Sequence, residues 1–180
     1  DRFGMAETFN EMGAEILFGD LIFGLGIPLA IRSVSQLEFL ARLIAPIITK
    51  LPFELIYPTG EKQDSLESKS KYDRYYNEVD IIAGDFHFIR RYMPDDLSGK
   101  IIITNTVTEN DVCELKKRNV EKLITTTPEL RGRSFGTNVM EAVLVALLGK
   151  KPEKISSQEY VDLLEKINFK PRVLNMAEIS

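Results

Sequence analysis

Continuous apolar runs in the second half of the chain constrain its fold more than any other feature. We expect three strands from these runs, at 80–85, 99–106 and 121–127, and a segment with helical spacing follows each one. Because the runs do not alternate apolar with polar residues, they are typical of parallel strands covered on both faces. Strands and helices in this order predict an α/β fold, Rossmann-like and doubly wound, with a mainly parallel sheet flanked by helices.

The helices of this half carry start and stop signals. They are expected over 87–93, 108–120, 136–149 and 156–167. Thr108 with Asp111, and Ser156 with Glu159, are the side-chain pairs of two capping boxes. Gly149 ends the third of these helices, because glycine adopts the left-handed cap conformation without a Cβ clash.

The first residues predict a loop that enters a helix. Apolar residues then recur at helical spacing, at Phe3, Ala6, Phe9 and Met12. Gly13 ends this helix, and the short apolar run 14–20 is expected as a strand that ends in Asp20.

The middle of the chain is less regular. Residues 37–51 present a wide apolar face, and Pro46 is expected to kink or split the helix there. We expect this face to pack in the core, with a neighbouring subunit of a homo-oligomer as the alternative. The polar run 60–71 predicts a solvated loop, and the tyrosine-rich segment 71–80 predicts a helix face packed on the sheet.

Composition excludes several classes of protein. The 180 residues suit one domain, and a net charge of −4 without a basic block disfavours nucleic-acid binding. The single cysteine, Cys113, is expected to be a packing residue on a helix, and without a Cys/His cluster no metal site is expected. The longest apolar stretch, 21–31, is too short to span a bilayer, so we expect a cytoplasmic protein without membrane contact.

The chain begins at Asp1 rather than at a methionine. We therefore expect residues 1–180 to be a single Rossmann-like domain that is a fragment of a longer protein, with a strand or a whole domain missing upstream.

Ligands of open parallel sheets bind beyond the carboxyl ends of the strands. Four segments are expected at that edge, at 1–5, 19–26, 84–91 and 125–138. The first resembles part of the dinucleotide fingerprint, with Gly4 for close approach to a pyrophosphate and Asp20 for the ribose hydroxyls. The earlier glycine of that fingerprint is absent, so the alternative is a fold that binds no cofactor. The residues expected to bind the cofactor are Gly4, Met5, Asp20, Gly84, Asp85, Thr104, Asn105 and Thr106.

The segment 84–91 contains His87, the only histidine of the chain. Asp85 is expected to cap the next helix, which places His87 in the first helical turn. His87 is a candidate proton donor or acceptor, and the alternative is an exposed histidine without a role. Arg90 and Arg91 point to different sides, so at most one faces the crevice. Alternatively, these arginine side chains are solvated at the surface or form an ion pair with Asp95 or Asp96.

The segment 125–138 combines threonines, arginines and glycines between a strand and a helix. The amino terminus of that helix offers backbone amides and a favourable dipole to an anion. The alternative is a loop with turn-forming glycines and solvated arginines. The residues expected to bind an anion are Arg131, Arg133, Ser134, Gly136, Thr137 and Asn138.

Four blocks of the sequence resemble a group of bacterial proteins often labelled quinate 5-dehydrogenase. These blocks are DRFGMAETFNEMGAEILFGDLIFGLGIP, LPFELIYPTGEKQ, IIAGDFHFIRRYMPDDLSGKIIITNTVTENDV and LITTTPELRGRSFGTNVMEAVLVALLGK. Shikimate and quinate dehydrogenases bind their acid in a separate domain with a Lys and Asp pair, and this chain contains no such motif. The resemblance therefore implies the nicotinamide-binding half of such an enzyme.

Two functional hypotheses follow. The first is an NAD(P)-binding domain of a quinate- or shikimate-dehydrogenase-like oxidoreductase, with NAD or NADP as cofactor. Asp20 favours NAD, because a carboxylate there repels a 2′-phosphate. The second is a non-catalytic Rossmann-like module that binds a small anion, a nucleotide or a partner protein.

Overall fold

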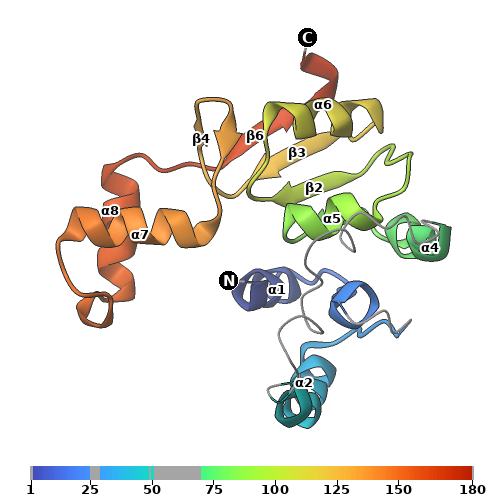
Figure 1. The fold of residues 1–180 in the computed structure, drawn as a ribbon, viewed down its shortest axis with the longest axis horizontal. Helices are drawn as coiled ribbons and strands as arrows, with labels where there is room; N and C mark the ends of the chain where they lie inside the picture. Colours follow the sequence, from blue (N-terminus) through green and yellow to red (C-terminus); the bar gives the residue numbers. More distant parts are fainter. Residues whose placement is uncertain (1, 25–28, 49, 51–69, 180) are drawn as a thin grey trace. The chain divides into compact units, whose positions relative to one another are not determined.

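The computed structural model describes residues 2–24, 29–48, 50 and 70–179. It divides the chain into two compact units, Asp1–Lys69 and Ser70–Ser180, which are described separately below (Figure 1). Of the loop expected at 60–71, residues 60–69 lie outside the described residues and 70–71 belong to a helix instead. Part of the loop expected at 19–26 also lies outside the described residues. The expectation of a single domain over 1–180 stays a prediction.

A four-stranded sheet forms the centre of the second unit. Its strands are β1 (Ile81–Ala83), β2 (Ile101–Thr104), β3 (Lys122–Thr125) and β6 (Arg172–Asn175), in the order β1-β2-β3-β6. The first three run parallel, and β6 pairs antiparallel with β3. The expected α/β class with a mainly parallel sheet and flanking helices is therefore confirmed, whereas β6 was not predicted.

Two crossover helices cover one face of this sheet. Helix α5 (Phe86–Tyr92) joins β1 to β2, and α6 (Glu109–Lys117) joins β2 to β3. Because the three parallel strands follow one another in chain order, right-handed crossovers place both helices on the same side (Figure 1). The buried strand residues Ile82, Ile102 and Leu123 form one register row on the covered face.

Helix α4 (Ser70–Glu78) precedes the sheet and buries three tyrosines, Tyr72, Tyr75 and Tyr76. The hydroxyl of Tyr76 donates to the Ile89 carbonyl oxygen at 3.3 Å, and the rings of Tyr72 and Tyr92 lie 4.8 Å apart. Burial raises the pKa of Tyr76 well above its usual value. The expected helix is present and its tyrosines are buried, but these contacts join it to α5, and the expected packing on the sheet stays a prediction.

Two helices lie between β3 and β6 and pack on each other. They are α7 (Thr137–Leu148) and α8 (Ser157–Lys166), with a short 3-10 turn at Pro152–Lys154 between them. Gly149 ends α7 with a φ of 62°, and Ser156 with Glu159 forms the expected capping box of α8. A last 3-10 turn, Met176–Glu178, follows β6.

The first unit contains α1 (Arg2–Glu11) and α2 (Val34–Ile48). Gly13 follows α1 with a φ of 80°, as its position after the helix predicts. The buried residues Phe18, Leu21 and Ile31 form a small core between the two helices.

Two expectations for this unit are wrong. The run 14–20 is not a strand, because its only described pairing is a single bridge between Phe18 and Ile31. Residues Asp20–Gly24 form a π-helical turn. The prediction failed because a short apolar run does not by itself distinguish a strand from a buried helical segment. Of the two alternatives for Pro46, the split is wrong, because α2 continues to Ile48, and the kink stays a prediction.

Candidate functional site

The carboxyl ends of the three parallel strands are tied together by backbone and threonine hydrogen bonds. The buried hydroxyl of Thr104, at the end of β2, donates to the Gly84 carbonyl oxygen at 2.7 Å. The Gly84 amide donates to the Ile103 carbonyl oxygen at 3.0 Å, and the Thr126 amide donates to the Thr104 carbonyl oxygen at 2.9 Å. The residues that follow β1, β2 and β3 therefore share one edge of the sheet, as expected for Gly84 and Thr104.

The loop after β2 lies against the start of α7. Thr106 has a positive φ of 52°, and its hydroxyl donates to Asn105 Oδ1 at 3.2 Å. A Cβ added to Gly136 would lie 3.4 Å from Thr106 Oγ1, which is ordinary van der Waals contact, so the start of α7 lies beside this loop. Gly136 is the N-cap of α7 and provides no side-chain hydrogen bond. Unlike α5 and α6, this helix begins without a side-chain cap on its first amides.

A short hairpin occupies the middle of the expected loop 125–138. Its strands are β4 (Glu129–Leu130) and β5 (Arg133–Ser134), joined by Arg131 and Gly132 with φ angles of 54° and 80°. Two positive φ values in a two-residue turn define a type I′ turn, which normally requires glycine or asparagine. Arg131 adopts this left-handed conformation although it is neither glycine nor asparagine. Its exposed side chain extends from the tip of the hairpin.

The hairpin is fixed to the loop after β2. The Ser134 amide donates to the Val107 carbonyl oxygen, and the Val107 amide donates to Ser134 Oγ, each at 2.9 Å. Arg133 forms an isolated bridge with Thr108, and its guanidinium lies 5.9 Å from the ring centroid of Phe135. Ser134 is thus a buried structural residue, while the Arg133 side chain is exposed.

Two threonines that the sequence interpretation did not select hold the loop after β3. Thr125 Oγ1 donates to the Thr127 carbonyl oxygen at 2.8 Å, and Thr127 Oγ1 donates to the Phe135 carbonyl oxygen at 2.7 Å. Both side chains are fully buried. The signal that could have identified them is the run of three threonines directly at the end of an apolar strand.

Asp85 has the capping role that its position predicts. Its carboxylate accepts a hydrogen bond from the His87 amide at 2.9 Å at the start of α5. His87 therefore lies in the first turn of α5, where its side chain is exposed.

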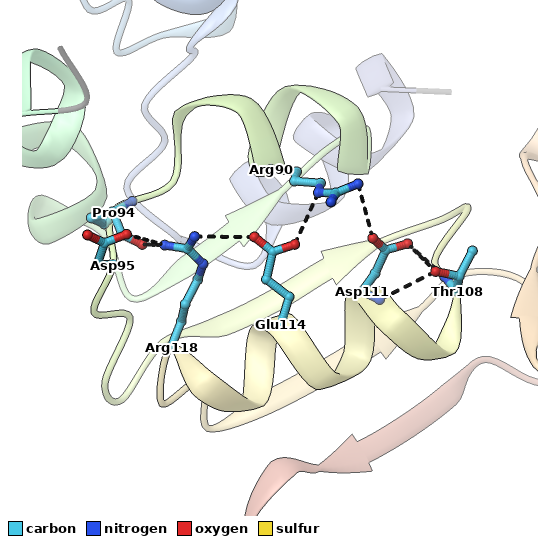
Figure 2. A network of polar contacts seen from close by, with 7 residues as sticks. All are labelled: Arg90, Pro94, Asp95, Thr108, Asp111, Glu114 and Arg118. Atoms are coloured by element: carbon cyan, nitrogen blue, oxygen red, sulfur yellow. Dashed lines mark hydrogen bonds and ion pairs between the residues drawn. The ribbon is translucent and has the colours of Figure 1, made fainter. Parts of the chain in front are cut away.

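Arg90 contacts a helix rather than the edge of the sheet (Figure 2). Its guanidinium binds Glu114 Oε2 at 3.1 Å and Asp111 Oδ1 at 3.5 Å, both on α6. For Arg90, the expected alternative of an ion pair with Asp95 or Asp96 named the wrong partners, whereas for Arg91 it stays a prediction. The side-by-side arrangement of α5 and α6 brings these acids closer to Arg90 than the loop that follows α5.

Arg118 extends the same network to the end of α5. It binds Glu114 Oε1 at 3.2 Å, Asp95 Oδ1 at 2.8 Å and the Pro94 carbonyl oxygen at 2.6 Å (Figure 2). Glu114 thus accepts from two arginines, and the network connects the outer surfaces of α5 and α6. This arrangement stabilises the helical layer and does not form part of the ligand edge.

The remaining expected cofactor residues belong to the first unit. Gly4 and Met5 lie inside α1, so the loop expected at 1–5 is helical from Arg2 onward. Gly4 was expected to allow a close approach of the backbone to a pyrophosphate. A Cβ added to Gly4 would meet nothing within 4 Å, so the described residues of the first unit do not require a glycine there. Asp20 is the first residue of the π-helical turn rather than the end of a strand.

The structure thus brings together one group of the predicted residues at the edge of the second unit: Gly84, Asp85, Thr104, Asn105, Thr106, Arg131, Arg133, Ser134, Gly136, Thr137 and Asn138. Thr137 and Asn138 form the exposed first turn of α7. Among the described residues, no group of three His, Cys, Asp or Glu side chains could hold a metal ion. In the same residues, no helix has the length and apolar character needed to cross a membrane.

One comparison with known proteins identifies a family. A family model described as a domain of unknown function (DUF8754) matches residues 1–176. No curated protein matches the chain, and neither does any solved structure.

Proposed function

Since the chain belongs to the DUF8754 family, we propose from the geometry of the site that it is a Rossmann-like module that binds a small anionic ligand. The ligand carries a phosphate or a carboxylate, as nucleotides and hydroxy acids do. The observation that carries this proposal is that Gly136, at the uncapped start of α7, contacts the loop after β2 at the carboxyl edge of three parallel strands. Ligands of parallel α/β sheets bind at that edge.

The chemistry of the edge suits an anion. The uncapped amino terminus of α7 presents backbone amides and the positive end of the helix dipole. Arg131 and Arg133 add two exposed guanidinium groups, which bind phosphate or carboxylate through two parallel hydrogen bonds. Three acids lie near this edge: Asp85 caps α5, Glu129 pairs with Arg172, and the Glu109 carboxylate lies against Gly132, between Arg131 and Arg133.

A nicotinamide dinucleotide is the first ligand to test, because it carries the phosphate groups that the start of α7 and the two arginines suit. An oxidoreductase that uses NAD or NADP is therefore the second candidate function, with His87 as its candidate acid or base.

Calorimetric titration of the protein with NAD, NADP, ADP and inorganic phosphate tests both candidates. Binding of ADP or phosphate alone supports the anion module, and tighter binding of a complete dinucleotide supports the cofactor domain. Arg131→Ala removes one charged hydrogen-bond donor and is expected to weaken binding by about tenfold or more. Lys117→Ala, an exposed cation on α6, is the matched control and leaves the affinity unchanged. If none of the four compounds binds, the proposal is wrong.

A further inference from the structure

The Asp111 carboxylate is shared between α5 and the start of α6 (Figure 2). Its Oδ1 atom pairs with the Arg90 guanidinium at 3.5 Å. Its Oδ2 atom accepts from the Thr108 amide at 2.9 Å and from the Thr108 hydroxyl at 2.7 Å. Because a carboxylate is planar, a contact at one oxygen helps to fix the direction in which the other oxygen points. Arg90 therefore orients the carboxylate that caps α6.

The residue that this carboxylate holds also contacts the β4–β5 hairpin. Thr108 pairs with Arg133 in an isolated antiparallel bridge. The residue before it, Val107, exchanges two hydrogen bonds with Ser134, each of 2.9 Å. The end of the loop after β2 and the strand β5 are thus joined at two successive positions.

The first turn of α6 also contacts the tip of the hairpin. A Cβ added to Gly132 would lie 2.5 Å from Glu109 Oε1, closer than real atoms approach, so the Glu109 carboxylate lies directly against the turn. Gly132 follows Arg131, which the turn holds in a left-handed conformation. The segment 107–109 therefore contacts three consecutive hairpin residues, and its own position depends on the cap that Asp111 forms.

We propose that Arg90 is a positioning residue for the anion-binding edge, an inference that rests on the proposed function. Arg90 orients the Asp111 carboxylate, which holds Thr108. Thr108 in turn pairs with the hairpin that carries the two exposed arginines. Arg90 acts through these contacts rather than on the ligand, because its guanidinium is engaged by Asp111 and Glu114 on α6. An arginine suits this role, since its planar group presents several donors in fixed directions.

Arg118 provides an internal comparison, because it belongs to the same network. It binds Glu114, Asp95 and the Pro94 carbonyl oxygen at the opposite end of α6, and among the described residues no ion pair joins it to Asp111. If Arg90 only fastened α5 to α6, loss of either arginine would affect the hairpin equally. If Arg90 acts through the cap, its loss alone loosens the hairpin.

Hydrogen exchange of the ligand-free protein, followed by NMR, tests the positioning directly. The probe is the Ser134 amide, which donates to the Val107 carbonyl oxygen in the contact between loop and hairpin. The reference is the Ile101 amide, which donates to the Asp80 carbonyl oxygen at the amino end of β2. The ratio of the two exchange rates removes any general change in stability.

Arg90→Ala is expected to raise this ratio by about two- to fivefold, the range of an exposed ion pair. Arg90→Lys keeps the charge and is expected to recover part of the protection. Arg118→Ala is the matched control and leaves the ratio unchanged, and Arg118→Lys replaces it if the alanine variant does not fold. An unchanged ratio in Arg90→Ala, or an equal rise in the Arg118 variant, overturns the proposal.

Titration with NAD, NADP, ADP and inorganic phosphate separates this inference from the proposed function. For a compound that binds the wild type, Arg90→Ala is expected to weaken binding by about two- to fivefold, whereas the Arg118 variant leaves it unchanged. An unchanged affinity in Arg90→Ala, despite faster exchange of the Ser134 amide, overturns the inference alone. If none of the four compounds binds the wild type, the proposed function is wrong, and the exchange ratio still decides whether Arg90 positions the hairpin.

Discussion

Helices α6 and α7 differ in a way that composition does not predict. Five of the nine residues of α6 are charged, yet Val112 and Leu115 are buried and even Asp111 is nearly covered. Only one of the twelve residues of α7 is charged, yet Met140 and Leu144 are its only buried residues. The comparison shows that burial depends on which neighbour a helix meets. Helix α6 crosses from β2 to β3 over the sheet and is joined to α5 by the ion pairs of Arg90, whereas α7 packs with α8.

The largest expected difference concerns two leucines. Leu115→Ala in α6 removes a fully buried side chain and is expected to lower the free energy of unfolding by about 2–5 kcal/mol. Leu147→Ala in α7, where the side chain is 60% exposed, is expected to change it by less than about 0.5 kcal/mol. Urea denaturation of both variants at low protein concentration measures the difference. Equal losses would contradict the comparison.

The next largest effect concerns a buried side chain, Tyr76, and the stability of the protein at alkaline pH. Burial first, and then the charge of Tyr92, raises the pKa of Tyr76, so the folded protein keeps this phenol protonated. The unfolded chain releases the proton near pH 10, so stability is complete below pH 10 and falls above it, by up to about 1.4 kcal/mol per pH unit.

Denaturation between pH 9 and 11 measures this slope. Tyr76→Phe is expected to reduce it, at the cost of the hydrogen bond to the Ile89 carbonyl oxygen. An unchanged slope in this variant would assign the alkaline effect to other groups.

A smaller effect concerns the starts of the two helices. Thr108 caps α6 in a complete capping box with Asp111, so Thr108→Ala is expected to destabilise the protein by about 1 kcal/mol. Gly136 begins α7 without a side-chain cap, and its φ of −65° is accessible to other residues. Gly136→Ser is therefore expected to stabilise the protein by a few tenths of a kcal/mol. Thermal unfolding of both variants gives the two signs, and a stabilising Thr108→Ala would refute the assignment of the cap.

The smallest effect is a local acid response at the start of α8. Hydrogen bonds from Lys150 first, and then from Ser156, lower the pKa of the Glu159 carboxyl from 4.5 to about 2. These contacts stabilise the start of α8 above about pH 4.5 and are lost as the pH falls toward 2. Titration of the Glu159 carboxyl by NMR measures the pKa. In Lys150→Ala it is expected to rise toward 4.5, and an unchanged value would exclude Lys150 as the main cause.

Local signals predicted much of the second unit. The three apolar runs became β1, β2 and β3, and the capping boxes at Thr108 and Ser156 formed as expected. Strand β6 was missed because its sequence, RVLN, is short and contains two polar residues. The hairpin was taken as a loop because its turn uses Arg131, where a type I′ turn usually has asparagine or glycine.

The candidate site was predicted in part for the same reason. Its residues in the second unit follow strands that local patterns identified, so Gly84, Thr104 and Gly136 lie at the expected edge. Gly4, Met5 and Asp20 were chosen from a motif that requires a loop and a strand, and α1 and a π-helical turn stand there instead. The partners of Arg90 could not be predicted, because they lie 21 and 24 residues away on a neighbouring helix.

The amino-acid sequence by itself determined the α/β class, the order of the three parallel strands and their helices in the second unit and the capping boxes of α6 and α8. These features depend on apolar spacing and on hydrogen bonds between residues three or four positions apart. Only the tertiary structure decided that α5 and α6 lie on the same face of the sheet and that Arg90 binds α6. It also decided that Val139, Val143 and Leu147 of α7 are exposed. These features depend on contacts between residues that are distant along the chain, and no local pattern encodes which of them meet.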